Sequence, residues 1–159
     1  MEKDIRQSIT DYRMPRYICE ILCNHYAKAF LDMTIICEND TYIFSYDKKN
    51  KRRLVYRELT EIDKLQLVLT LIMINDNNCQ MLIGAERYLI EPELIYSVRN
   101  RTDYNSIGIL FYPDTTMTPF NIKLIRFMDK IGTKNKKKAI NCFELIKDEL
   151  AKNEIYRAK

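Results

Sequence analysis

Two apolar runs on either side of a polar turn form the clearest hydrophobic pattern in the chain. The runs lie at residues 87–97 and 107–113 and are rich in Ile, Leu and aromatic residues, whereas residues 99–105 between them are polar. Apolar runs separated by a short polar stretch are typical of a β-hairpin. We therefore predict an antiparallel hairpin from residues 93–98 and 107–112.

A helix is predicted immediately before this hairpin. Residues 60–74 are apolar on nearly every side, which places the helix in the core, packed on the hairpin. Thr60 and Asp63 have the spacing of a capping box at its start. The polar residues 75–78 are expected to end it.

Two more helices are predicted after the hairpin. Thr118 as cap and Pro119 as first residue predict the start of one, with Gly132 as its stop. Its buried stripe would consist of Phe120, Leu124, Phe127, Met128 and Ile131. The last helix is expected at residues 137–153, where apolar residues again recur at helical spacing.

The sequence of the first half of the chain predicts strands and a helix in alternation. Residues 1–13 are polar, so we expect a flexible lead-in. Residues 16–22 follow a proline and predict a first strand. Asn24 would cap a helix over residues 24–34, and residues 42–46 alternate aromatic with other residues as a half-buried strand does.

Composition and length predict one soluble domain. Hydrophobic residues make up 47% of the 159 positions and charged residues 30%, which argues against disorder. We expect an α+β fold in a single domain over residues 14–155, with sub-lobes at about residues 14–74 and 75–155. The longest apolar run, residues 65–74, is far shorter than the roughly 20 residues of a membrane span.

The cysteines and the N-terminus bear on the compartment. The five cysteines are odd in number and mostly lie in apolar segments, as the buried thiols of cytosolic proteins do. The charged residues at the N-terminus are not followed by the apolar segment of a signal peptide. We therefore expect a cytoplasmic protein without a membrane span.

Residues 90–96 carry a family resemblance. They read Ile-Glu-Pro-Glu-Leu-Ile-Tyr and resemble the Leu-Lys-Pro-Glu-Asn-Ile-Leu segment that follows the His-Arg-Asp triplet of protein kinases. Over residues 12–155, the chain is similar to a bacterial domain of unknown function found N-terminal to forkhead-associated (FHA) domains in Firmicutes. That family in turn resembles the kinase-like cytoplasmic domain of the EssB/YukC proteins of type VII secretion. The features that carry the resemblance are residues 16–22, 24–34, 42–47, 60–74, 90–96 and 110–113.

The resemblance implies a reduced protein-kinase-like fold. It would have a small N-terminal lobe of strands and helix and a mostly helical C-terminal half with a central β-hairpin. It also implies a kinase without catalysis, because the catalytic Asp position is Leu89 and the Mg²⁺-binding Asn position is Leu94. No Asp lies between residues 107 and 112, and no Gly precedes Gly84, so a second metal ligand and a Gly-rich phosphate loop are missing. We therefore expect no enzymatic activity and no cofactor.

A zinc site is the next candidate in the sequence. Cys19, Cys23, His25 and Cys37 are close enough in sequence to suggest one. No second Cys-x₂-Cys pair completes a tetrahedral set, and the chain has a single histidine, so buried thiols are the favoured reading. We expect no metal.

The charged turns are the remaining candidates. A possible interaction surface combines the basic turn with two nearby carboxylates, namely Lys48, Lys49, Lys51, Arg52, Arg53, Glu91 and Glu93. Glu91 and Glu93 are read as a polar turn rather than an acid–base pair, because nothing nearby in the sequence offers a pocket.

These observations favour a non-catalytic, kinase-like interaction or sensory module that binds a protein partner. By the resemblance it would belong to an FHA-containing signalling or envelope-associated system. The alternative is a nucleic-acid-binding module that uses the 48–53 turn with a second basic run, Lys134, Lys136, Lys137 and Lys138. We expect no nucleic-acid binding, because the two runs lie in separate turns and acidic residues follow the second.

Overall fold

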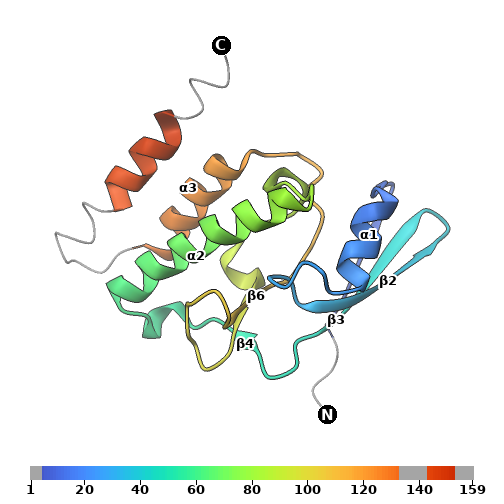
Figure 1. Cartoon of the computed structure of the whole chain (residues 1–159), viewed down its shortest axis with the longest axis horizontal. Helices are drawn as coiled ribbons and strands as arrows, with labels where there is room; N and C mark the ends of the chain where they lie inside the picture. The colour runs from blue at the N-terminus through green and yellow to red at the C-terminus, as the bar shows by residue number, and fades with distance from the viewer. Residues whose placement is uncertain (1–4, 133–142, 153–159) are drawn as a thin grey trace.

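The computed structural model describes residues 5–132 and 143–152. The fold is mixed α+β, as predicted, with two small antiparallel sheets and helices that lie mostly on the side of the second sheet (Figure 1). In the described part of the chain, no helix combines the length and apolarity needed to cross a membrane.

The first sheet has the strand order β1-β3-β2, from β1 (Ile5–Thr10), β2 (Asp32–Glu38) and β3 (Thr41–Asp47). The predicted strand at residues 42–46 is confirmed as the central strand β3. Asn39 and Asp40 both have positive φ, 48° and 59°, as a two-residue β-hairpin turn requires. α1 (Arg16–Cys23) lies beside β2 (Figure 1).

Three predictions for the N-terminal segment were wrong. The expected flexible lead-in contains β1, which pairs along its whole length with β3; only Ile5 and Ile9 are partly buried, so this edge strand has the composition of a loop. The expected strand at residues 16–22 is the helix α1, because Ile18 and Leu22, one helical turn apart, are its buried residues. A short apolar run does not distinguish the two periodicities.

The third error concerns residues 24–34, which do not form a helix. Asn24 follows the end of α1 instead of starting a helix, and its backbone and side-chain N–H groups both donate to the Glu20 carbonyl, at 3.0 and 2.7 Å. β2 then begins at Asp32. Asn24 does cap a helix, but it caps the C-terminal end of α1 and not the N-terminal end of a following helix.

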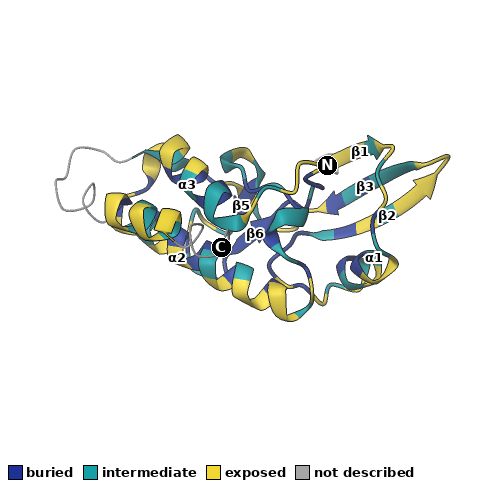
Figure 2. Ribbon diagram, turned by 90° about the horizontal axis from the view of Figure 1, so that it is seen from above, coloured by how far each residue is buried: buried dark blue, intermediate teal, exposed yellow. Residues whose placement is uncertain are grey.

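The second sheet has the order β4-β5-β6, from β4 (Arg52–Arg53), β5 (Ile95–Ser97) and β6 (Ile107–Ile109). The predicted antiparallel hairpin is confirmed, although its strands are shorter than expected. Phe30 forms a parallel bridge with Ile109 on the free side of β6. The chain that leads into β2 therefore joins the two sheets, and Figure 2 shows buried residues concentrated where they meet.

α2 (Glu61–Gln80) starts at the predicted capping box. The Asp63 N–H donates to Thr60 Oγ1 at 3.1 Å, and the Thr60 N–H donates to the Asp63 carboxylate at 2.9 Å. The predicted end at residues 75–78 was wrong, because the helix continues to Gln80 and the buried Asn78 side chain donates to the Tyr88 hydroxyl at 3.1 Å. The sub-lobe boundary expected between residues 74 and 75 thus falls inside α2.

α2 is also less buried than predicted. Ile62, Leu69 and Met73 are 78%, 57% and 52% exposed. Leu67 and Leu71 are buried, with exposures of 0% and 1%. Apolar residues occur on all sides of this helix, so their pattern alone did not reveal which side faces the core.

α3 (Phe120–Ile131) ends at Gly132, as predicted, with a φ of 59°. The predicted Thr118 cap was wrong: no side chain caps α3, and the Thr118 N–H donates to Asp114 Oδ2 at 3.3 Å. Residues 143–152 form a further helix whose Leu150 carbonyl accepts from Asn121 Nδ2 at 3.2 Å. The other predicted residues of that helix, 137–142 and 153, lie outside the described residues.

A buried ion pair anchors α3. Lys123 Nζ lies 2.7 Å from Asp114 Oδ2 and donates to the carbonyls of Ala85 at 2.6 Å and Tyr88 at 2.5 Å. The side chains of Lys123 and Asp114 are only 6% and 4% exposed. This single ammonium ties α3 to the segment before the hairpin and to the loop after it.

Candidate interaction site

The basic turn at residues 48–53 connects the two sheets. It leaves β3 of the first sheet and enters β4, which pairs with β5 of the second sheet. Lys49 forms an ion pair with Asp32, and its N–H donates to Asp47 Oδ1 at 2.8 Å. The Lys51 side chain lies against Gly108, where an added Cβ would come 2.8 Å from Lys51 Cδ. The side chains of Lys49 and Lys51 are therefore engaged with β2 and β6, respectively.

Arg52, Arg53 and Arg99 line a cavity of about 460 Å³. We call this cavity the arginine pocket. It is lined by Asn50, Arg52, Arg53, Val55, Glu58, Ser97, Arg99 and Asn100. Three arginines thus line one cavity, with a single carboxylate, Glu58, among its lining residues.

Arg99 is presented by a tight turn. Arg99 and Asn100 have positive φ values of 53° and 57°, and the Arg101 N–H donates to the Val98 carbonyl at 3.1 Å. Positive φ at both central residues with this hydrogen bond is the type I′ turn. The Asn100 side chain then clamps Val55, accepting from its N–H at 2.8 Å and donating to its carbonyl at 3.2 Å. The turn is therefore attached directly to the segment that follows β4.

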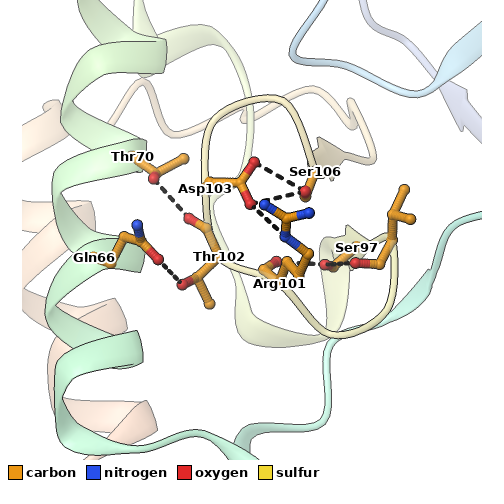
Figure 3. A network of polar contacts seen from close by, with 8 residues as sticks. Gln66, Thr70, Ser97, Arg101, Thr102, Asp103 and Ser106 are labelled. Atoms are coloured by element: carbon orange, nitrogen blue, oxygen red, sulfur yellow. Dashed lines mark hydrogen bonds and ion pairs between the residues drawn. The ribbon is translucent and has the colours of Figure 1, made fainter.

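A polar network holds the rest of this loop against α2 (Figure 3). Thr70 Oγ1 donates to the Thr102 carbonyl at 2.7 Å, and Thr102 Oγ1 donates to Gln66 Oε1 at 2.7 Å. On the other side of the loop, the Ser97 hydroxyl donates to the Arg101 carbonyl. The predicted packing of the hairpin on α2 is thus made partly by hydrogen bonds from its loop.

Asp103 closes the network inside the loop. It accepts from Ser106 Oγ at 2.9 Å and lies 3.0 Å from Arg101 Nε (Figure 3). Although burial opposes the charged form, the hydrogen bond from Ser106 and the charge of Arg101 lower the pKa of Asp103. Arg101 is thereby neutralised within the loop, and Arg99 is the arginine that reaches the pocket.

The charges of the pocket are incompletely compensated within the described part of the chain. Arg53 Nε donates to the Tyr96 hydroxyl at 3.3 Å; this hydrogen bond, with a smaller contribution from the charge of Glu93, raises the pKa of Arg53. Among residues 5–132 and 143–152, Arg52 and Arg99 form no ion pair. The positive charge of the three lining arginines therefore exceeds the negative charge of the one lining carboxylate, which favours binding of an anion.

The predicted interaction surface is only partly assembled. Glu93 is exposed and lies close enough to Arg53 to interact with its charge. Glu91 instead forms an ion pair with Lys130 of α3 and lines a separate cavity of about 140 Å³. Lys48 is half-buried and does not line the pocket.

Arg99 was missed at the sequence level. The signal that could have suggested it was the basic pair Arg99 and Arg101 in the polar turn of the hairpin. Its position at the same cavity as Arg53 depends on the pairing of β4 with β5, in which Arg53 lies opposite Tyr96. That pairing joins segments far apart in the chain.

The two leucines at the positions compared with kinase catalytic residues are both half-buried. Leu94 is half-buried and packs against the hydrophobic core. Leu89 is also half-buried, and its N–H donates to the Tyr112 carbonyl at 2.9 Å. Neither side chain can bind a metal ion or accept a proton.

The zinc candidates are spread over α1, the segment that follows it and β2. Cys19 and Cys23 are one turn apart on α1, where burial raises the pKa of the Cys19 thiol, and Cys37 is exposed on β2. His25 Nδ1 lies 3.3 Å from Asp32 Oδ1, in a cavity of about 360 Å³ that Cys23 also lines. Within the described ranges, no group of three or more His, Cys, Asp or Glu residues is arranged to hold a metal ion.

The second basic run at residues 134–138 lies outside the described residues, so its place relative to the arginine pocket stays a prediction. Comparison with known proteins adds no family: no protein-family model and no curated protein sequence matches the chain.

Proposed function

We propose that this protein is a non-catalytic interaction module whose arginine pocket binds an acidic group of a protein partner. The observation that carries the proposal is the arrangement of Arg52, Arg53 and Arg99 around one cavity of about 460 Å³. Guanidinium groups bind oxyanions through charge-assisted hydrogen bonds that can be bidentate. The Asn100 clamp and the hydrogen-bond network to α2 already hold the loop in one conformation. Binding of a partner therefore requires little further ordering of the loop.

The wider setting is part of the same proposal. We take the chain to have a reduced kinase-like fold and to serve an FHA-containing signalling or envelope-associated system. The small first sheet with α1, followed by a mostly helical half around β5 and β6, is compatible with that fold. Leu89 and Leu94 in place of catalytic polar residues support an interaction role over phosphoryl transfer.

The nucleic-acid alternative is less well supported. A nucleic acid presents a row of phosphates and binds best to an extended basic stripe. Here Glu58 lines the pocket and Glu93 lies near Arg53, so acidic residues interrupt the positive charge around the pocket. We expect random single- and double-stranded oligonucleotides not to bind at micromolar protein in about 150 mM salt, where charges are screened beyond about 8 Å.

The test compares an acidic peptide with its neutral counterpart. A fluorescent peptide of alternating Asp and Ser and the same peptide with Asn for Asp are titrated with the protein, and anisotropy is recorded. We expect binding of the acidic peptide only. Replacing the three arginines together, Arg52→Gln, Arg53→Gln and Arg99→Gln, should weaken it at least about tenfold, because one charge-assisted hydrogen bond contributes roughly 1.5–3 kcal/mol.

A matched control removes the same charge elsewhere. Arg6, Arg13 and Arg126 are exposed and do not line the arginine pocket. The variant with Arg6→Gln, Arg13→Gln and Arg126→Gln should bind like the original protein. Equal loss in both triple variants would mean non-specific attraction, and salt-sensitive oligonucleotide binding lost only in the pocket variant would favour the nucleic-acid alternative.

A further inference from the structure

We infer that the arginine pocket takes a phosphate monoester carried by the partner protein. This inference rests on the proposed function and specifies the chemical group that is bound. It follows from the number of charges in the pocket, from how they are held, and from the acidic residues that surround them.

The charge count favours a dianion. Three guanidinium groups and the one carboxylate, Glu58, give the lining residues a net charge of 3 − 1 = +2. A phosphate monoester carries about −1.5 to −2 at neutral pH and has three acceptor oxygens, whereas an Asp or Glu side chain carries one charge. A phosphate therefore matches the net charge of the lining residues, while a carboxylate leaves roughly half of that charge uncompensated.

The arginines come from two backbone segments that are fixed to each other. Arg52 and Arg53 lie on β4, where Arg52 pairs with Ser97 and Arg53 with Tyr96 of β5. Arg99 follows two residues after Ser97, in the turn that Asn100 fastens to Val55. Arginines supplied to one cavity by two such segments suit a tetrahedral anion, which accepts hydrogen bonds from several directions.

The surroundings favour a single phosphate on a protein over a polyanion or a membrane. Glu58 on the pocket wall and Glu93 near Arg53 would repel neighbouring phosphates of a nucleic acid or an anionic lipid surface. Val55, which is 36% exposed, offers apolar contact to the carbon atoms that carry the phosphate. β4 is the outer strand of its sheet, so an extended segment of the partner can lie along it.

The experiment uses four probes with the full chain. Three are degenerate peptides with random flanking residues and a fixed central phosphoserine, serine or glutamate. The fourth is a phosphatidylcholine vesicle containing a phosphoinositide. We expect the phosphoserine peptides to bind at least about tenfold more tightly than the glutamate peptides, because a charge-assisted hydrogen bond to a dianion is stronger, and serine peptides and vesicles not to bind.

The variants separate the two proposals. The triple change of Arg52, Arg53 and Arg99 to Gln should abolish the phosphoserine preference, and Arg99→Lys should weaken it by losing the bidentate fork while keeping the charge. Equal binding of phosphoserine and glutamate peptides would overturn this inference and leave the proposed function standing. Binding of neither peptide would overturn both, and a preference for the vesicles would overturn the protein source of the phosphate.

Discussion

The buried pair of Lys123 and Asp114 provides the sharpest test of how this fold is held together. Replacing Lys123 with Met keeps the length of the side chain and removes the ammonium group. Asp114 then loses its counter-ion at 2.7 Å, and the carbonyls of Ala85 and Tyr88 lose their shared donor. Both side chains of the pair are nearly inaccessible to bulk water, so only water in the adjoining cavity of about 140 Å³ can replace part of the lost contacts.

The expected cost is large. Removing one partner of a buried ion pair costs about 3–5 kcal/mol, because a buried charge is left uncompensated. Asp114 keeps hydrogen bonds from the Thr116 N–H at 2.8 Å and hydroxyl at 2.6 Å, which places our expectation near the lower end, about 3 kcal/mol. Domains are usually stable by about 5–15 kcal/mol, so the variant should fold but unfold much more readily.

Urea unfolding followed by circular dichroism measures this loss. With a slope of about 2 kcal/mol per molar urea, the midpoint should fall by about 1.5 M. Lys130→Met is the matched control on the same helix, because Lys130 pairs with Glu91 at the surface and its side chain is 51% exposed. Exposed ion pairs contribute about 0–1 kcal/mol, so the control midpoint should hardly move.

The ion pair of Lys123 and Asp114 also predicts how the stability of the protein changes at low pH. Burial opposes ionisation of Asp114, but the hydrogen bonds from Lys123 and Thr116 prevail and lower its pKa below the usual 3.8. A carboxyl whose pKa is lower in the folded state contributes stability above its unfolded pKa, and that contribution is lost as pH falls through the folded value. The original protein should therefore lose stability below about pH 4, and Lys123→Met should lose less in that range.

A second variant keeps the reasoning testable if Lys123→Met does not fold. The double change Lys123→Met with Asp114→Asn removes both charges, and it should regain part of the lost stability because no buried charge is left unpaired. A midpoint for Lys123→Met within the range of the Lys130→Met control would refute the role given to the pair. So would a double variant less stable than Lys123→Met alone.

Three further predictions concern the helices and nucleotide binding. Thr60→Ala should lower the free energy of unfolding by about 1 kcal/mol, because the Asp63 N–H loses its acceptor, and Thr60→Ser in the same urea titration should not. Leu71→Ala should cost about 2–5 kcal/mol and Leu69→Ser less than about 1 kcal/mol, since Leu71 is 1% and Leu69 57% exposed; equal losses would mean that α2 is oriented differently. ATP with Mg²⁺ should not change the thermal unfolding midpoint, although a ligand at 100 times its Kd adds about 2.7 kcal/mol, and a Mg²⁺-dependent rise would point to an active nucleotide site.

Local sequence patterns predicted an element correctly where the residues that define it lie within or next to that element. The strand at residues 42–46, the hairpin around residues 99–105, the capping box at Thr60 and the stop at Gly132 all match the structure. Each depends on neighbours in the chain: alternation along a strand, turn residues, or a cap bonded three residues away. The conformations of these residues are therefore largely set by local sequence.

The same reasoning failed where distant contacts choose between local alternatives. Residues 5–10 became a strand because β3 supplies their hydrogen bonds, and residues 16–22 became a helix because its buried face packs beside β2. Asn24 has the chemistry to serve either end of a helix. These choices are made by tertiary packing, which outweighs the small differences in intrinsic propensity.

The candidate site shows the same division. The sequence identified Arg52 and Arg53 as part of a basic turn, since their charge is visible in the residues themselves. Only the tertiary structure added Arg99 and assigned Lys49 and Glu91 to ion pairs elsewhere. A pocket is a property of surfaces brought together by strand pairing and loop closure, and the pairing of β4 with β5 lies between residues too distant in sequence for any local pattern to specify.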